Sequence, residues 1–194
     1  MPRPSLKAER TEQILQAFER CVARYGLDGS SLERIAEEAG LRRPLVRHFV
    51  GNRDELVQQL AERVIKRSDE QWHTFLSSLP EQNAVEGLLD GLFHDSASDA
   101  DFVLVIESLI FAAGRDQHLR EKMQRWLKRF TDDLNELLAR DFPSADEQAI
   151  KAVSFGLLSL YFNLDSLAPL QMNHLYRQDA RTAAEHLIST LGAK

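Results

Sequence analysis

The chain has 194 residues, of which 43% are hydrophobic and 28% charged, a composition that is ordinary for a folded protein of one or two domains. A single cysteine, Cys21, excludes an intramolecular disulfide and fits the reducing cytoplasm, where we expect the protein. No apolar run approaches the length of a membrane span, and the first residues lack the apolar segment of a signal peptide. Only 9 glycines and 6 prolines occur, which favours helices over strands.

The formal net charge of −6 is unevenly distributed along the chain. Residues 1–67 contain 13 Lys and Arg against 10 Asp and Glu, whereas residues 68–194 contain 11 against 20. The two parts therefore carry net charges of +3 and −9. Such asymmetry indicates what each part binds rather than how it folds.

The first three predicted helices are separated by turn residues. The first covers about residues 5–25 and ends before a glycine. The second begins at Ser30, because Ser30 and Glu33 match a capping box, and it ends before Gly40. The third spans about residues 43–50.

The second and third helices together have the build of a helix-turn-helix unit. Leu32, Ile35 and Ala36 fall on one face of the second helix by 3.6-residue periodicity. Small residues on that face, Ala36 and Ala39, allow the two helices to approach closely. Units of this kind place their second helix in the DNA major groove.

Three arginines crowd the start of the third helix: Arg42, Arg43 and Arg47. A helix N-terminus disfavours cations because the helix dipole is positive there. The cluster therefore indicates an anionic partner such as the DNA phosphates. A solvated basic face is the alternative.

A long fourth helix is predicted from Asn52, which forms a second capping pattern with Glu55, to about residue 79. Further helices are predicted over residues 84–94, 102–113, 118–142, 145–168 and 177–191. The second of these is nearly all apolar, so we expect it to be buried. No strand-like alternation is evident, and the expected fold class is all-α with about nine helices.

Residues 31–41 and 47–56 resemble the TetR family of transcriptional repressors, and the resemblance is specific over about residues 10–60. It implies a homodimer with a three-helix DNA-binding domain at residues 1–52. It also implies a helical domain at residues 53–194 that binds a small-molecule effector and forms the dimer. Arg42, Pro44 and Arg47 depart from the family pattern, and Arg47 is expected to alter base choice because arginine contacts guanine bidentately.

The same resemblance places the DNA contacts. Candidates for contacts in the groove are Arg43, Leu45, Arg47 and His48, and candidates for contacts to the DNA backbone are Ser30, Ser31, Arg42 and Arg53. Core packing is the alternative for Leu45, packing or capping for His48, and a purely structural cap for Ser30. A flexible arm near the phosphates, or alternatively a solvated tail, is expected from Arg3, Lys7 and Arg10.

The effector, whose identity the sequence does not give, is expected to lie in the second domain. The candidate lining residues are Trp72, Phe75, Phe102, Ile106, Glu107, Phe111, Trp126, Phe130, Tyr161, Phe162 and Asp165. Glu107 and Asp165 interrupt apolar helices, and a carboxylate in a pocket suits a cationic or hydrogen-bond-donating ligand. Core packing is the alternative for the apolar residues, and solvent exposure for the two acids.

A dimer interface is expected on the last two helices, where small residues would let two such helices from each subunit form a four-helix bundle. The candidates are Ala149, Ala152, Val153, Gly156, Leu160, Ala183, His186 and Leu187. The competing interpretation is a buried face within one subunit.

The sequence contains no phosphate-binding glycine loop, clustered metal ligands or nucleophile motif, so we expect no enzyme, no cofactor and no metal. It predicts a ligand-responsive transcriptional regulator, in the simplest case a repressor, that binds a palindromic double-stranded operator as a homodimer and is released by a small molecule. The alternative is a helical protein-interaction domain without specific DNA binding.

Overall fold

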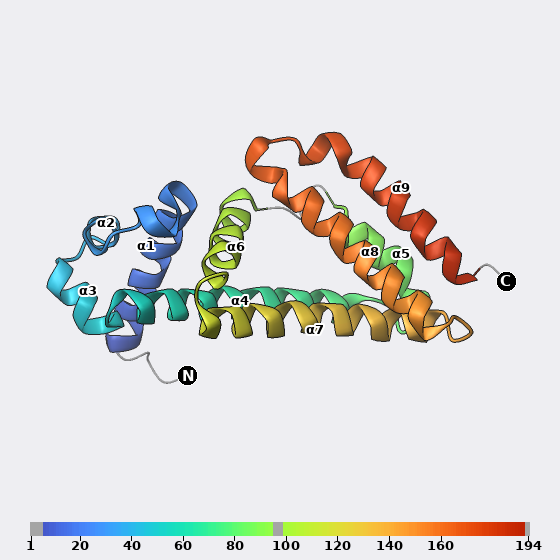
Figure 1. Cartoon of the computed structure of the whole chain (residues 1–194), viewed down its shortest axis with the longest axis horizontal. Helices are drawn as coiled ribbons and strands as arrows, with labels where there is room; N and C mark the ends of the chain where they lie inside the picture. Colours follow the sequence, from blue (N-terminus) through green and yellow to red (C-terminus); the bar gives the residue numbers. More distant parts are fainter. Residues whose placement is uncertain (1–5, 95–98, 193–194) are drawn as a thin grey trace. The chain divides into compact units, whose positions relative to one another are not determined.

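The computed structural model describes residues 6–94 and 99–192, and Figure 1 traces the helices in chain order. These residues contain nine α-helices, one short 3-10 helix and no strand. The elements are α1 (Leu6–Gly29), α2 (Leu32–Glu38), α3 (Arg43–Val50), α4 (Arg53–Ser78), α5 (Ala84–Leu92), α6 (Ala100–Ala113), α7 (Gln117–Asp141), α8 (Glu147–Ser166), η1 (Ala168–Leu170) and α9 (Asn173–Gly192). The all-α fold predicted from the sequence is confirmed.

The chain divides into two compact units. Unit 1 comprises Met1–Ser68 and Leu104–Met123, and unit 2 comprises Asp69–Val103 and Gln124–Lys194. Both α4 and α7 contribute residues to each unit. The division expected between residues 52 and 53 falls inside unit 1, because the first turns of α4 bond to α1 and to the end of α3.

The turn between α2 and α3 follows from a glycine and from hydrogen bonds to α1 and α2. Gly40 has a φ of 63°, a left-handed conformation that glycine adopts without steric cost. The backbone N–H of Leu41 donates to the Ala36 carbonyl at 2.8 Å. The Gln13 side chain of α1 donates to the Ala39 carbonyl at 2.8 Å. These bonds fix the turn against the first helix.

The start of α2 lies one residue later than the capping-box pattern predicts. The N-cap is Ser31, whose hydroxyl accepts the N–H of Arg34 at 3.3 Å. Ser30 is fully buried, and its hydroxyl donates to the Gly26 carbonyl at 2.6 Å. The reason is that α1 kinks at Gly26, where φ is 68°, and the Ser30 hydroxyl closes the turn after this kink.

The capping pattern predicted at the start of α4 is confirmed. The backbone N–H of Asn52 donates to Glu55 Oε2 at 2.8 Å, and the N–H of Glu55 donates to Asn52 Oδ1 at 2.9 Å. This reciprocal pair satisfies two N–H groups that the helix itself leaves unbonded. It fixes the position at which α4 leaves the end of α3.

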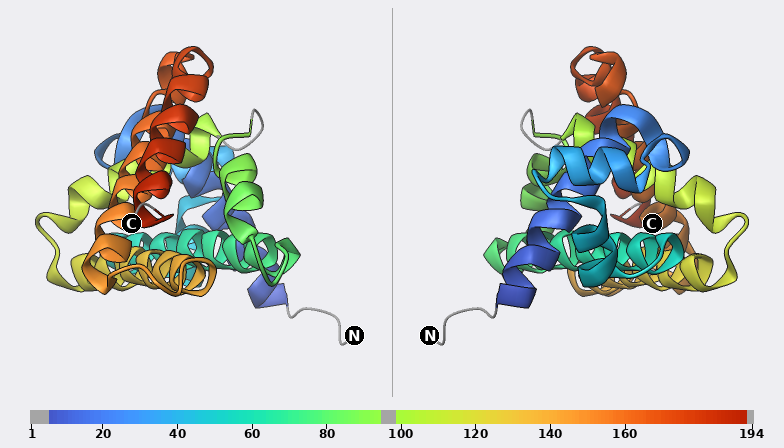
Figure 2. Two further views of the ribbon diagram at one scale, coloured as in Figure 1. Left: turned by 90° about the vertical axis from the view of Figure 1, so that its right-hand side faces the viewer. Right: turned by 90° about the vertical axis from the view of Figure 1, so that its left-hand side faces the viewer.

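In unit 2, α8 and α9 lie side by side, as the two views of Figure 2 show in orange and red. A Cβ atom at Gly156 would lie only 2.7 Å from Leu187 Cδ1, so the two helices approach closely here and a larger residue would require the Leu187 side chain to move. The inner faces of both helices join a core that also takes residues from α4, α5 and α7.

The stretch Glu147–Leu170, which comprises α8 and η1, is long and apolar enough to cross a membrane by length and composition alone. This apolar stretch was not predicted from the sequence, where no run of that length was expected. It is weak evidence for a membrane helix, because a core helix of a packed domain meets the same measure. Val153, Leu157 and Leu164 of this stretch are indeed buried in the core of unit 2.

Candidate functional site

The outer face of α3 and its N-cap, Arg42, carry a cluster of exposed guanidinium groups. Arg42 and Arg47 are exposed, and neither makes an ion pair with another residue of the ranges 6–94 and 99–192. Arg43 lies 2.9 Å from Glu33 Oε1, but the two side chains are 61% and 58% exposed. Exposed pairs of this kind contribute little to stability and exchange readily with other partners. The cluster is therefore available to an external anion.

The same helix is anchored by its opposite face. Val46 and Val50 are buried, whereas Leu45 and His48 are exposed beside the arginines. The core alternative for Leu45 is thus excluded within this chain. The His48 ring packs edge-on against Phe49, with 5.1 Å between centroids, and stays exposed. All four residues predicted to enter the groove are exposed on α3.

Two residues predicted to touch the DNA backbone point into the protein instead. Ser30 is fully buried. The guanidinium of Arg53 donates to the carbonyls of Leu27 and Ser30 and lies 5.4 Å from the centroid of the Phe18 ring. Burial lowers the pKa of Arg53. This corrects the expectation for both residues, because their polar groups already have partners within unit 1. Ser31, in contrast, is exposed.

The predicted flexible arm does not form as expected. Lys7 and Arg10 belong to the first turns of α1, and Arg10 donates to Gln13 Oε1 at 2.6 Å. Arg3 lies outside the residues that the structure describes. The basic residues before the helix-turn-helix are therefore, where described, part of a helix.

Six of the predicted effector-lining aromatic residues form one cluster in unit 2. Trp72 stacks on Phe130 with ring centroids 4.0 Å apart, and Phe130 lies parallel to Tyr161 at 6.1 Å. The other ring pairs, at 5.6 to 6.4 Å, are Trp72–Phe75, Trp126–Phe162, Phe130–Phe162 and Tyr161–Phe162. The helices α4, α7 and α8 supply these rings.

Two carboxylates touch this aromatic cluster. The indole Nε1 of Trp72 donates to Asp133 Oδ2 at 2.8 Å. Burial, followed by the charge of Asp165 and a hydrogen bond to it, raises the pKa of Tyr161. Asp165 was predicted as a lining residue, whereas Asp133 was not. Asp133 could have been identified from the sequence by its spacing, because it lies three residues after Phe130 and hence on the same side of α7.

The remaining predicted lining residues lie on α6 and differ in exposure. Ile106 is buried and Phe102 half-buried, but Glu107 is exposed and Phe111 is 70% exposed. The guanidinium of Arg115 lies 5.5 Å from the Phe111 ring. The expected burial of the whole helix is therefore corrected, because α6 buries only one face. Glu107 and Phe111 lie at the surface of the chain.

Most predicted dimer residues pack within their own chain. Val153 is buried in the core of unit 2, Gly156 contacts Leu187, and Ala149, Leu160 and Leu187 pack against that core. Ala183 is half-buried, while Ala152 and His186 are exposed. The competing interpretation of a face within one subunit holds for the core-facing members. The exposed stripe of α8 consists instead of Ala152, Phe155, Ser159 and Asn163, and Phe155 is 67% exposed.

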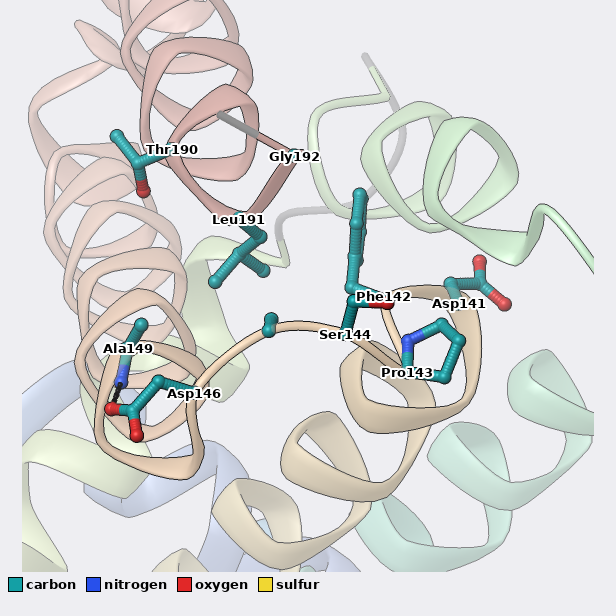
Figure 3. Close-up of a pocket in the computed structure, with 10 residues that line it drawn as sticks. Asp141, Phe142, Pro143, Ser144, Asp146, Ala149, Thr190, Leu191 and Gly192 are labelled. Atoms are coloured by element: carbon teal, nitrogen blue, oxygen red, sulfur yellow. Dashed lines mark hydrogen bonds between the residues drawn. The ribbon is translucent and has the colours of Figure 1, made fainter. Parts of the chain in front are cut away.

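A hollow of about 380 Å³ lies at the turn between α7 and α8, beside the end of α9 (Figure 3). Phe142, Ser144 and Leu191 are among the residues that line it. The Asp146 carboxylate at its edge caps α8, accepting the N–H groups of Gln148 and Ala149 at 3.0 and 3.2 Å. None of the predicted effector residues lines this hollow.

Comparisons with known proteins agree with this architecture. The HTH-type transcriptional regulator BetI of Vibrio vulnificus is 23% identical over 164 residues, which cover 81% of this chain and 83% of that protein. A TetR transcription regulator from Haloarcula marismortui superposes with a TM-score of 0.78 at 19% identity, over 94% of this chain and 97% of the other.

A transcriptional regulator from Saccharomonospora viridis, solved in complex with choline, gives a TM-score of 0.77 at 15% identity, over 93% and 96% of the two chains. No protein-family model matches the sequence. At these identities the structural likeness establishes the fold. The chain has the fold of TetR-family transcriptional regulators and is similar in sequence to HTH-type transcriptional regulators.

Proposed function

We propose that the protein is a homodimeric repressor that binds a palindromic operator through α3 and leaves it when a small organic cation binds to unit 2. The observation that carries the proposal is the exposed outer face of α3, where Arg42 and Arg47 have no carboxylate partner in the described part of the chain. Two such helices in a dimer would enter successive major grooves about 34 Å apart. Phosphates would supply the missing counter-charge.

Selection of bound fragments from random double-stranded DNA tests this proposal. The expected result is an inverted repeat whose half-sites are about one helical turn apart. Its affinity is expected to fall steeply as salt rises, since each phosphate contact releases counterions. A chain that enriches no sequence and binds DNA without salt dependence would instead be a helical protein-interaction domain.

For the dimer, we propose that the exposed stripe of α8 is the centre of the interface. Phe155 is a large apolar side chain on a surface that otherwise presents the small residues Ala152 and Ser159. An exposed aromatic residue among small residues is typical of an interface that a partner buries. His186 of α9 is a further exposed candidate.

The dimer proposal is tested by Phe155→Asp, with Leu127→Asp as the matched control at another exposed apolar residue of unit 2. Sedimentation analysis is expected to give a dimer for the parent chain and for the control, and a monomer for Phe155→Asp. A charge at the centre of an apolar interface is costly because it is buried without a partner. A dimeric Phe155→Asp would place the interface elsewhere.

For the effector, the aromatic cluster and its two carboxylates support a cationic ligand. Aromatic faces attract organic cations, and Asp133 and Asp165 add negative charge beside the rings. The choline bound to the Saccharomonospora viridis regulator is a ligand of this chemical class in a protein of the same fold. Choline is therefore a suitable first probe.

The effector proposal is tested by titrating choline into the complex with the selected DNA, in parallel with its neutral carbon isostere 3,3-dimethylbutanol. We expect choline to release the DNA and the isostere to do so far less, because only choline carries a charge. Asp165→Asn is expected to weaken the response to choline and leave DNA affinity unchanged. Equal responses to both compounds would exclude recognition of charge.

A further inference from the structure

The connection between the kink of α1 at Gly26 and the start of α2, residues 26–30, has four carbonyl groups bonded to side chains of the protein. The Gly26 carbonyl accepts the Ser30 hydroxyl at 2.6 Å. The Gly29 carbonyl accepts Arg34 Nη1 at 2.5 Å. The carbonyls of Leu27 and Ser30 accept the two terminal nitrogens of Arg53. The carbonyl oxygens of residues 26, 27, 29 and 30 thus already accept hydrogen bonds from side chains of unit 1.

Arg53 is the long-range member of this set. It lies 23 and 26 positions along the chain from its two acceptors, on the first turn of α4. Its planar guanidinium serves both carbonyls at once and lies over the Phe18 ring at 5.4 Å. A lysine ammonium has no such planar fork, so this geometry is specific to arginine.

The connection that Arg53 holds leads directly into the DNA-binding unit. Ser31, the next residue, is the N-cap of α2, and α2 leads through the Gly40 turn to α3. A displaced connection would therefore tilt α2 and move the exposed arginines of α3 away from their positions. Arg53 is well placed to influence DNA binding without contacting DNA.

We propose that Arg53 is a positioning residue of the DNA interface, which holds the carbonyls of residues 27 and 30 and so sets the orientation of the helix-turn-helix. The inference rests on the proposed DNA-binding function. It differs from a phosphate contact in a measurable way, because a phosphate contact contributes to the salt dependence of binding and a positioning residue does not.

Two substitutions at this position and one matched control separate the two roles. Arg53→Gln removes the charge and the fork, Arg53→Lys keeps the charge and removes the fork, and Arg42→Gln is the same exchange at an exposed arginine of α3. Affinity for the selected operator is measured at several salt concentrations, and circular dichroism verifies that each full-length variant is folded.

For Arg53→Gln, we expect affinity to fall about tenfold or more, in the range of a lost charge-assisted hydrogen bond, with the salt slope of the parent chain. For Arg42→Gln, the slope is expected to decrease by about one. Arg53→Lys is expected to lose affinity despite its charge, again at constant slope, whereas a phosphate contact would let lysine substitute well.

A slope decrease in Arg53→Gln equal to that of Arg42→Gln would overturn the proposal, as would parent-like affinity in Arg53→Lys. If Arg53→Gln does not fold, the affinity of Arg53→Lys decides alone. Failure of the broader function is recognised separately, because the parent chain would then show no salt-dependent binding to any DNA.

Discussion

The outer face of α3 and the first turns of α4 are both rich in arginine, yet their guanidinium groups are bonded in opposite ways. At the N-cap of α3 and on α3 itself, Arg42 and Arg47 are exposed and have no carboxylate partner in the described residues. On α4, Arg53 bonds two backbone carbonyls and Arg63 bonds Glu12 and Glu19 of α1. The difference teaches that the number of arginines does not locate a DNA contact. We expect the existing partners of each arginine to decide whether it contacts DNA.

The physical reason lies in what each guanidinium gains from its neighbours. A half-buried arginine with hydrogen-bonded oxygens is already stabilised, and a phosphate would have to replace those bonds. An exposed arginine without a partner gains a charge-assisted bond at no such cost. The comparison therefore predicts that substitution of Arg63 on α4 lowers stability, and that substitution of the exposed arginines at α3 removes direct contacts to DNA.

The largest expected effect on folding is that of Arg63→Gln. The Arg63 and Glu19 side chains are only 20% and 15% exposed, and Nε lies 3.0 Å from Glu19 Oε2. Removing the Arg63 guanidinium leaves the largely buried Glu19 carboxylate with fewer hydrogen-bond donors and less positive charge beside it. We expect this to lower the free energy of unfolding by about 2 kcal/mol. Urea denaturation measures this change in the free energy of unfolding. The control Arg47→Gln is expected to change stability by less than about 0.5 kcal/mol, and equal losses would remove the distinction between the two helices.

The largest expected effect on recognition is that of Arg47→Ala. If Arg47 reads a base, the substitution weakens binding to the selected operator by roughly 1–3 kcal/mol and relaxes selectivity at one position of each half-site. Fluorescence anisotropy with operator and random DNA measures both quantities. Equal losses on the two DNAs would assign Arg47 to the phosphate backbone instead.

The smallest expected effect concerns an arginine of α1. The hydrogen bond from Arg20 Nε to Glu38 Oε1, at 2.5 Å, is the main cause that lowers the pKa of Glu38 below the ordinary value of 4.5. A lowered carboxyl pKa stabilises the folded state above the pKa of the unfolded chain, and this contribution is lost as pH falls through the folded pKa. An NMR titration of the Glu38 carboxyl is expected to show the low pKa, and Arg20→Gln to raise it. An unchanged pKa in Arg20→Gln would exclude this bond as the cause.

Features that depend on neighbours along the chain were predictable from the sequence. The third helix was expected over residues 43–50 and has those bounds, and Asn52 with Glu55 forms the expected cap. Gly40, before which the second helix was expected to end, has a positive φ. Each of these features is fixed within a few residues, by a hydrogen bond to a nearby N–H or by the conformational freedom of one glycine. The start of α2 was missed by one residue, because the kink at Gly26 gives Ser30 a different acceptor.

The direction of a side chain was much harder to predict. The position of Arg53 beside a basic cluster suggested a DNA contact, but two carbonyls far back in the chain turn it inward. Glu107 and Phe111 lie in a nearly all-apolar helix, which suggested burial, and both are exposed. The small residues of α8 suggested contact with a second subunit, and Gly156 contacts α9 of the same chain.

By itself, the sequence determined the helices, their caps, the glycine turn and the basic surface of the recognition helix, because these arise from backbone conformation and periodicity over a few residues. Only the tertiary structure decided which arginines remain unpaired, which face of α6 is buried and which stripe of α8 stays exposed. A long polar side chain reaches several possible partners, and a helix with two apolar faces can bury either. The elements that pack against the side chain or the helix determine which partner it bonds and which face it buries, and these elements lie far away in the chain.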